Sequence, residues 1–186
     1  MTRRVRILAS AVLAGSLALA GTACGTAKAD KNAPDPTDRL TIVVPQTLAG
    51  LKVSPSKKAT ETLLAAGKGP NNYQKDAQVF ELRLGKELQA VLQITRLTAD
   101  ARTDQPDFRR RIIESNLINA SREAVTFAGI DVYKASVNRQ TIYVWFQSKF
   151  MEVLMVRSDS ITLAQQGAIN VTALVTAAVQ LKPTAA

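Results

Sequence analysis

Few residues in this chain have side chains that suit catalysis. The sequence contains no histidine and a single cysteine, Cys24, so histidine-based triads and histidine metal sites are excluded. Neither of the two common glycine-rich phosphate loops occurs in it. Ser54 and Lys57 form an S-x-x-K pattern, the arrangement of a serine nucleophile activated by lysine. Its partner motifs S-D-N and K-T-G are missing, so we interpret the pattern as a capping serine before a helix.

Three aspartates, Asp100, Asp104 and Asp107, form a second cluster. Clustered carboxylates suit hard cations such as calcium. The spacing and the glycine of an EF-hand loop are absent from this stretch, however, and Arg102 lies among the acids. Asp104 and Asp107 have the spacing of a helix cap. The sequence therefore predicts a capped helix here, no metal site and no cofactor.

The N-terminus has the pattern of an export signal. Three arginines within the first six residues precede an uncharged apolar run at 7–20, and small residues follow. This order is typical of a secretory signal peptide, and the run is shorter than the roughly 20 apolar residues of a membrane span. Two cleavage sites fit. Cleavage after Ala20, in an A-x-A pattern, predicts a secreted protein. Cleavage before Cys24 would instead make that cysteine the first residue of the mature protein.

The segment Ala20-Gly21-Thr22-Ala23-Cys24 resembles the lipobox of bacterial lipoproteins. The resemblance implies that residues 1–23 are a lipoprotein signal peptide and that Cys24 carries a diacylglyceryl group. Two acyl chains hold a protein stably to a bilayer, which places this one on the outer face of the bacterial cytoplasmic membrane. Residues 25–38 have two prolines and no hydrophobic period, so we expect 24–38 to be the lipidated cysteine and a disordered tether.

Residues 39–186 are predicted to form one globular domain. Apolar alternation and short apolar runs predict strands at 40–44, 78–84, 88–97, 123–127, 132–137, 141–146 and 150–156. Helical periods predict helices at 57–66, 108–120 and 162–181. By propensity, 88–97 also fits a helix and 169–175 also fits a strand. The expected fold class is α+β, with a mostly antiparallel sheet, a C-terminal four-strand meander and about three helices. This order of elements is similar to that of small lipoprotein domains of unknown function in high-GC Gram-positive bacteria.

The chain is basic, with 24 Lys plus Arg against 15 Asp plus Glu and a net charge of +9. Two groups of cations form a candidate anion-facing patch: Lys52, Lys57, Lys58, Lys68, Lys75, Arg109, Arg110 and Arg111. Cations in the first turn of a helix oppose its dipole, which favours an anionic partner. For an exported protein we expect an anionic envelope polymer, lipid headgroups or another envelope protein, and no nucleic acid. The alternative is that the charge serves solubility alone.

The strands at 132–156 are apolar on both faces, as in a sheet covered by helices on each side. One face could instead line an apolar pocket at Tyr133, Tyr143 and Trp145. No paired carboxylates at a diagnostic spacing can be read from the sequence, so we expect no enzyme. Since pockets forfeit packing contacts, we expect a non-enzymatic binding or accessory module at the cell envelope. A lipid or hydrophobic-ligand carrier is the first alternative. A hydrolase of the Ser/Lys or carboxylate type is the second.

Overall fold

The computed structural model of the protein describes residues 40–66, 73–117, 121–137, 140–157, 159–160, 167 and 169–185. The predicted signal peptide, lipobox with Cys24 and tether, together with Lys68, lie outside these residues. The fold and the sites below concern the described residues alone.

The described helices and strands include most of the predicted ones. Strands at Thr47–Leu48, Leu51–Pro55 and Thr184–Ala185 were not predicted, and the strand expected at 40–44 is formed only at Leu40–Thr41. The helices are α1 (Lys57–Ala66), α2 (Pro106–Asn116) and α4 (Val171–Val179). The strands of the main sheet are β2 (Thr47–Leu48), β3 (Leu51–Pro55), β4 (Gln74–Leu84), β5 (Glu87–Leu97), β6 (Ser121–Phe127), β7 (Ile130–Val137), β8 (Gln140–Gln147) and β9 (Phe150–Arg157). A separate two-stranded sheet pairs β1 (Leu40–Thr41) with β10 (Thr184–Ala185).

The main sheet has eight strands in the order β2-β3-β4-β5-β9-β8-β7-β6, and all of its pairs are antiparallel. The α+β class with an antiparallel sheet is therefore confirmed. The predicted meander is confirmed in part, because β6 to β9 pair in chain order but β9 also pairs with β5. The four strands are thus one half of a larger sheet.

Local turn chemistry explains the hairpins. Gly85, between β4 and β5, and Gly129, between β6 and β7, have φ values of +60° and +79°. Tight hairpin turns require such positive φ values, which glycine adopts without steric cost. The β5 segment, which also fitted a helix by propensity, is a strand because its period of two buries Leu92 and Ile94 on one face and Gln93 on the other.

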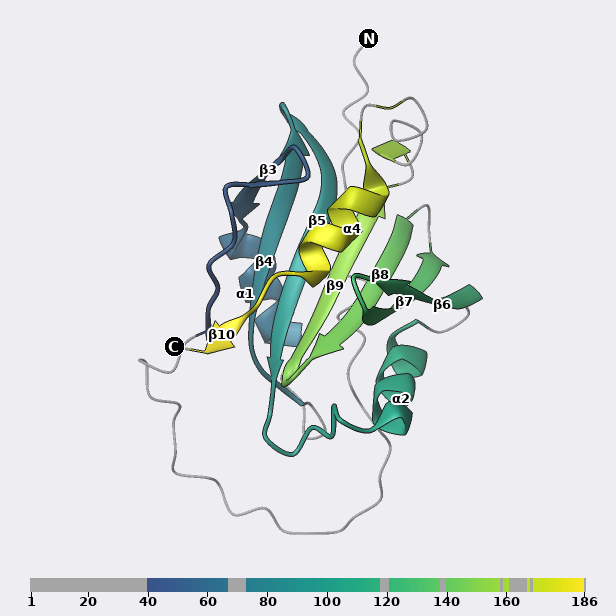
Figure 1. The fold of residues 1–186 in the computed structure, drawn as a ribbon. Coiled ribbons are helices and arrows are strands. Elements are labelled where there is room, and N and C mark those ends of the chain that lie inside the picture. Colours follow the sequence, from purple (N-terminus) through teal and green to yellow (C-terminus); the bar gives the residue numbers. More distant parts are fainter. Residues whose placement is uncertain are drawn as a thin grey trace.

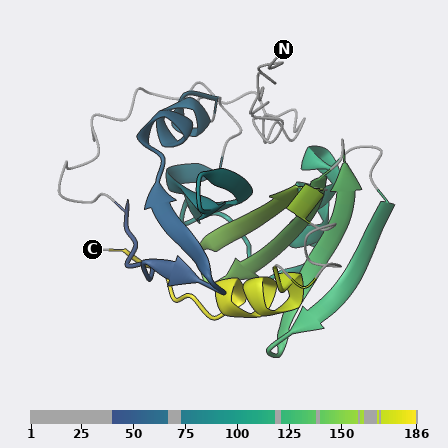
Figure 2. The same ribbon diagram turned by 90° about the horizontal axis from the view of Figure 1, so that it is seen from above.

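Helices cover the two faces of the sheet unequally (Figures 1 and 2). α4 crosses one face, and α1 and α2 lie on the opposite face, α1 over β4 and α2 against β7 to β9. α4 contacts both β2 and β6, which come from opposite edges of the sheet. The sheet therefore curls around α4, as its edges do in Figure 2. We call these two sides the α4 face and the α1/α2 face.

Two predicted helix starts are wrong. The N-cap of α2 is Gln105, whose side chain makes no capping hydrogen bond, and Pro106 occupies the first turn. Proline suits this position because it lacks the N–H that a cap would satisfy, so the expected Asp104–Asp107 cap is not formed. The predicted helix at 162–181 does not run unbroken: Gly167 has a φ of +79°, and Asn170 caps α4 by accepting from the Ala173 N–H at 2.9 Å.

Candidate functional site

One group of cations gathers where β3 meets α1. The antiparallel register of β3 and β4 places Lys52 directly opposite Arg83. Arg83 donates two hydrogen bonds to Glu81 Oε2, from Nε at 3.0 Å and from Nη2 at 2.7 Å, and Ser56 Oγ donates to Glu81 Oε1 at 3.2 Å. Ser56 immediately precedes Lys57 and Lys58, the first residues of α1. We call Lys52, Lys57, Lys58 and Arg83 the basic region.

The basic region is only partly neutralised. Lys57 lies 3.9 Å from Glu61, with 91% of its side chain exposed, and Arg83 is bound by Glu81. Lys52 and Lys58 are exposed and form no ion pair with any described residue. Like charges opposite each other across a strand pair repel, and two lysines in a first turn oppose the helix dipole. This arrangement is suited to binding an anion.

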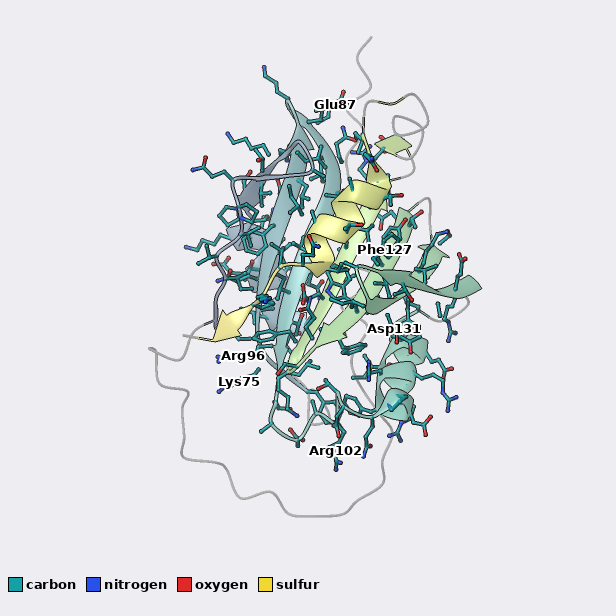
Figure 3. The ribbon with its side chains drawn as sticks, in the orientation of Figure 1. Lys75, Glu87, Arg96, Arg102, Phe127 and Asp131 are labelled. Carbon is teal, nitrogen blue, oxygen red and sulfur yellow. The ribbon has the colours of Figure 1, made fainter. Side chains whose placement is uncertain are left out.

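The other predicted cations lie elsewhere. Lys75 is on β4, eight residues before Arg83 and hence about 26 Å along the strand. Figure 3 shows it beside Arg96, at the end of the sheet opposite Glu87. The three arginines are on α2, which packs over a different part of the sheet from α1. Arg110 pairs with Asp107 at 2.9 Å, Arg109 is half-buried, and Arg111 is exposed. The seven described residues of the predicted patch therefore do not lie together.

The three aromatic residues of the predicted pocket are also separated. Tyr133 lies opposite Val144 in the register of β7 and β8, so it faces α2. Tyr143 and Trp145 point to the α4 face, where both are buried in the main apolar cluster. Because Tyr133 is on the other side of the sheet, these three side chains do not line one pocket.

A buried acid that the sequence analysis did not single out lies beside Trp145. Glu152 of β9 is opposite Trp145 on one side and Ile94 on the other, with no exposed surface. Neither carboxyl oxygen has a hydrogen-bond partner in the described part of the chain. The Trp145 N–H also lacks a well-formed hydrogen bond there. Its neighbours along β9 are Phe150 and Leu154, so the carboxyl group is enclosed by apolar side chains.

This burial changes the acid–base behaviour of the α4 face. Loss of solvation raises the pKa of Glu152 from 4.5 to about 8, and the nearby Trp145 N–H lowers it in part. Glu152 is therefore mostly protonated at neutral pH. Burial also raises the pKa of Tyr143, an effect that the charge of Lys134 opposes. Both groups are neutral in the folded protein near pH 7.

The two motifs with the spacing of a reactive site do not form one. Ser54 lies in β3 opposite Glu81, and the neighbouring Lys57 is exposed and paired with Glu61. Asp104 lies 3.6 Å from Arg102. Among the residues that the structure describes, no group of three or more acids, cysteines or histidines could hold a metal ion. Asp104 and Asp107 instead form ion pairs on the surface, with Arg102 and Arg110.

Arg83 and Glu152 were missed for different reasons. Arg83 stands in the polar half of an alternating strand, and only the β3–β4 register brings it beside Lys52. Glu152 did carry a sequence signal, since it is the one charged residue within the apolar run 150–156. Strands buried on both faces rarely hold an acid, so this residue could have been found.

Comparisons with known proteins give no relative: no family model matches, and neither curated proteins nor solved structures show a significant similarity to the chain. Within the described residues, the helices are all too short or too polar to cross a membrane.

Proposed function

We propose that this protein is a lipid-anchored extracytoplasmic lipoprotein that acts as a non-enzymatic binding or accessory module at the bacterial cell envelope. The anchor would be Cys24, after removal of residues 1–23, with residues 25–38 as its tether. In this proposal the basic region contacts an anionic partner whose shared chemistry is the phosphate or carboxylate group of headgroups and envelope polymers.

The observation that carries this proposal is the unneutralised charge of Lys52 and Lys58. Both are exposed, and both lie next to cations whose own carboxylates are already engaged. A membrane-anchored domain meets anionic lipids and polymers at high local concentration. Each lysine near such a surface contributes about 1 kcal/mol of attraction.

The two alternatives receive less support. A lipid carrier needs an apolar pocket, whereas Tyr143 and Trp145 pack beneath α4 and Tyr133 faces the other way. A carboxylate hydrolase needs an acid that reaches the substrate, whereas Glu152 has no exposed surface while α4 is docked. We therefore keep the carrier and the hydrolase as alternatives to the binding module.

Binding can be tested with vesicles and with a soluble polyanion. Chain 24–186 with Cys24→Ser is mixed with phosphatidylcholine vesicles, with vesicles containing phosphatidylglycerol, and with polyphosphate. We expect binding to the two anionic probes but not to phosphatidylcholine, and weaker binding as salt rises. Preference for one anionic probe identifies lipid headgroups or polymers as the source of the anion.

Charge-reversal variants locate the contact. Lys52→Glu and Lys58→Glu should each weaken binding at least fivefold, from the loss of about 1 kcal/mol per lysine. Lys182→Glu is the matched control, because Lys182 is exposed and lies far along the chain, after α4. Equal loss in all three variants, or no binding to either anionic probe, contradicts the proposed contact.

The anchor has its own test. The full chain is expressed in a bacterial host and partitioned in Triton X-114. We expect the protein in the detergent phase and the Cys24→Ala variant in the aqueous phase. Recovery of both proteins in the aqueous phase would refute lipidation without bearing on the basic region.

A further inference from the structure

Glu152 is buried between the sheet and α4, in a position that opposes its ionisation. Its cross-strand neighbours are Trp145 and Ile94, and the apolar cluster around it includes Leu174 and Val175 of α4. A carboxyl group removed from water without a hydrogen bond is strongly destabilised when it is charged. The ionised side chain of Glu152 therefore does not stabilise the fold at this position. A contact with α4 that depends on protonation of Glu152 fits this environment.

Two cations on the α4 face, Arg96 and Lys134, have other carboxylates as ion-pair partners, although Arg96 lies opposite Phe150, two residues along β9 from Glu152. Arg96 of β5 pairs with Asp76 of β4 at 3.9 Å, and Lys134 of β7 pairs with Glu123 of β6 at 3.2 Å. The segment Val171–Val179 contains no titratable side chain. Tyr143 is neutral near pH 7 at its ordinary pKa of 10.0, and burial raises that pKa further. No ion pair with a described residue therefore stabilises a charge on Glu152.

α4 can leave the sheet without breaking a strand pair of the main sheet. Its apolar residues Leu174, Val175, Ala178 and Val179 pack on the sheet, and Gln147 Nε2 donates to the Val179 carbonyl at 2.7 Å. Beyond it, only the two-residue β10 pairs with β1. Undocking of α4 would therefore leave the eight-stranded sheet paired, and amide exchange can report it separately from unfolding of the sheet.

We propose that α4 is a proton-linked cover of the sheet, which stays docked while Glu152 is protonated and undocks when Glu152 ionises. The α4 face, with Trp145 and Tyr143, is accessible only in the undocked form. This proposal concerns the opposite side of the sheet from the basic region, and it requires neither the lipid anchor nor an anionic partner.

The direction of the pH dependence follows from linkage. With α4 docked, burial raises the pKa of Glu152 to about 8, and with α4 undocked the carboxyl returns to its ordinary value of 4.5. Ionisation therefore favours the undocked form increasingly as pH rises from 4.5 to 8. Between pH 5 and pH 7.5 the undocking equilibrium constant should rise about 200-fold.

Hydrogen exchange of the full chain, purified in mild detergent, tests this directly. Exchange of peptides from α4 and from β5 is followed at pH 5.0 and pH 7.5, with rates corrected for the intrinsic effect of pH. We expect the protection of α4 amides to fall about 200-fold at the higher pH while β5 stays protected. Constant protection of α4 would overturn the proposal, and so would a parallel loss in β5, which indicates global unfolding.

Two variants assign the effect to one carboxyl group. Glu152→Gln is nearly isosteric with the protonated acid and cannot ionise, so α4 protection should no longer depend on pH. Glu123→Gln removes an exposed carboxylate from the same face and should behave as the wild type does. A pH dependence that persists in Glu152→Gln contradicts the proposal. Should this variant fail to fold, the wild-type comparison of α4 with β5 remains decisive.

Discussion

The sheet accommodates a glutamate on each of its faces, and the two are held in opposite ways. On the α1/α2 face Glu81 is half-exposed and accepts hydrogen bonds from Ser56 and Arg83. On the α4 face Glu152 is enclosed by apolar side chains, and its oxygens have no partner among the described residues. Partnered carboxylates stay ionised, whereas desolvated ones hold a proton. The covering helix, more than the residue type, decides the charge of an acid on this sheet.

The apolar packing differs between the faces as well. One continuous cluster fills the α4 face, whereas the α1/α2 face holds two separate clusters, one under each helix. Between these two clusters the buried side chain of Gln93 donates to Thr95 Oγ1 at 3.2 Å. A polar pair in this position divides the apolar packing. We therefore expect the two faces to contribute unequally to stability.

The largest expected difference between two compared proteins is that between the wild type and Glu152→Gln. Because the folded-state pKa is raised to about 8 from 4.5, the folded protein is favoured when Glu152 is protonated. The contribution of protonated Glu152 to the free energy of unfolding is fully present below pH 4.5 and is lost as pH rises to about 8. From pH 5 to pH 8 the wild type should lose about 3 to 4 kcal/mol more unfolding free energy than Glu152→Gln does. Urea denaturation at both pH values measures this, and equal losses would contradict the assignment.

A second comparison uses the same truncation on the two faces. Leu92 is fully buried in the α4-face cluster, whereas Leu63 of α1 is 8% exposed in the smallest cluster. Leu92→Ala should cost about 4 kcal/mol and Leu63→Ala about 2 kcal/mol, because the larger cluster collapses less around a void. Chemical denaturation at pH 6 compares the variants. A larger loss for Leu63→Ala would mean that the α1/α2 face dominates stability.

The smallest expected effect comes from breaking the ion pair between Arg83 and Glu81. Arg83→Ala removes the ion pair with Glu81, but the two side chains are 35% and 32% exposed, so solvent screens the interaction. We expect a loss below about 1 kcal/mol in denaturation experiments at pH 7, and a smaller loss in 1 M salt. A loss as large as that of Leu92→Ala would show that the basic region is structural.

Much of the fold could be predicted because its elements carry their own local signals. The helix expected at 57–66 matches α1, and the hairpin at Gly85 joins the expected strands. Alternation also separated the two faces of β8, with Tyr143 and Trp145 on one of them. By contrast, the apolar period around α4 contains no information on the positive φ of Gly167, so the helix was predicted too long.

The sites were harder to predict, because they depend on register between distant strands. Lys52 and Arg83 become neighbours through β3–β4 pairing, and Tyr133 is separated from Tyr143 by the β7–β8 register. The spacing of these residues along the chain predicts neither the proximity of Lys52 and Arg83 nor the separation of Tyr133 from Tyr143. The raised pKa of Glu152 depends on α4, which lies on β9 only in the folded protein. Sequence spacing therefore identified residues with suitable side chains but did not show which of them lie together in the fold.

The position of α4 also constrains the order in which the protein can fold. α4 is the last helix in the sequence, yet it occupies the concave side of a sheet whose central pair joins β5 to β9 across some sixty residues. Such non-local pairing is slow, because long loops must close before any contact stabilises them. During synthesis the α4 face is complete but uncovered until residues 171–179 emerge. Until α4 docks, the nascent chain therefore exposes its largest apolar surface, which is prone to self-association and is a surface that a chaperone could protect.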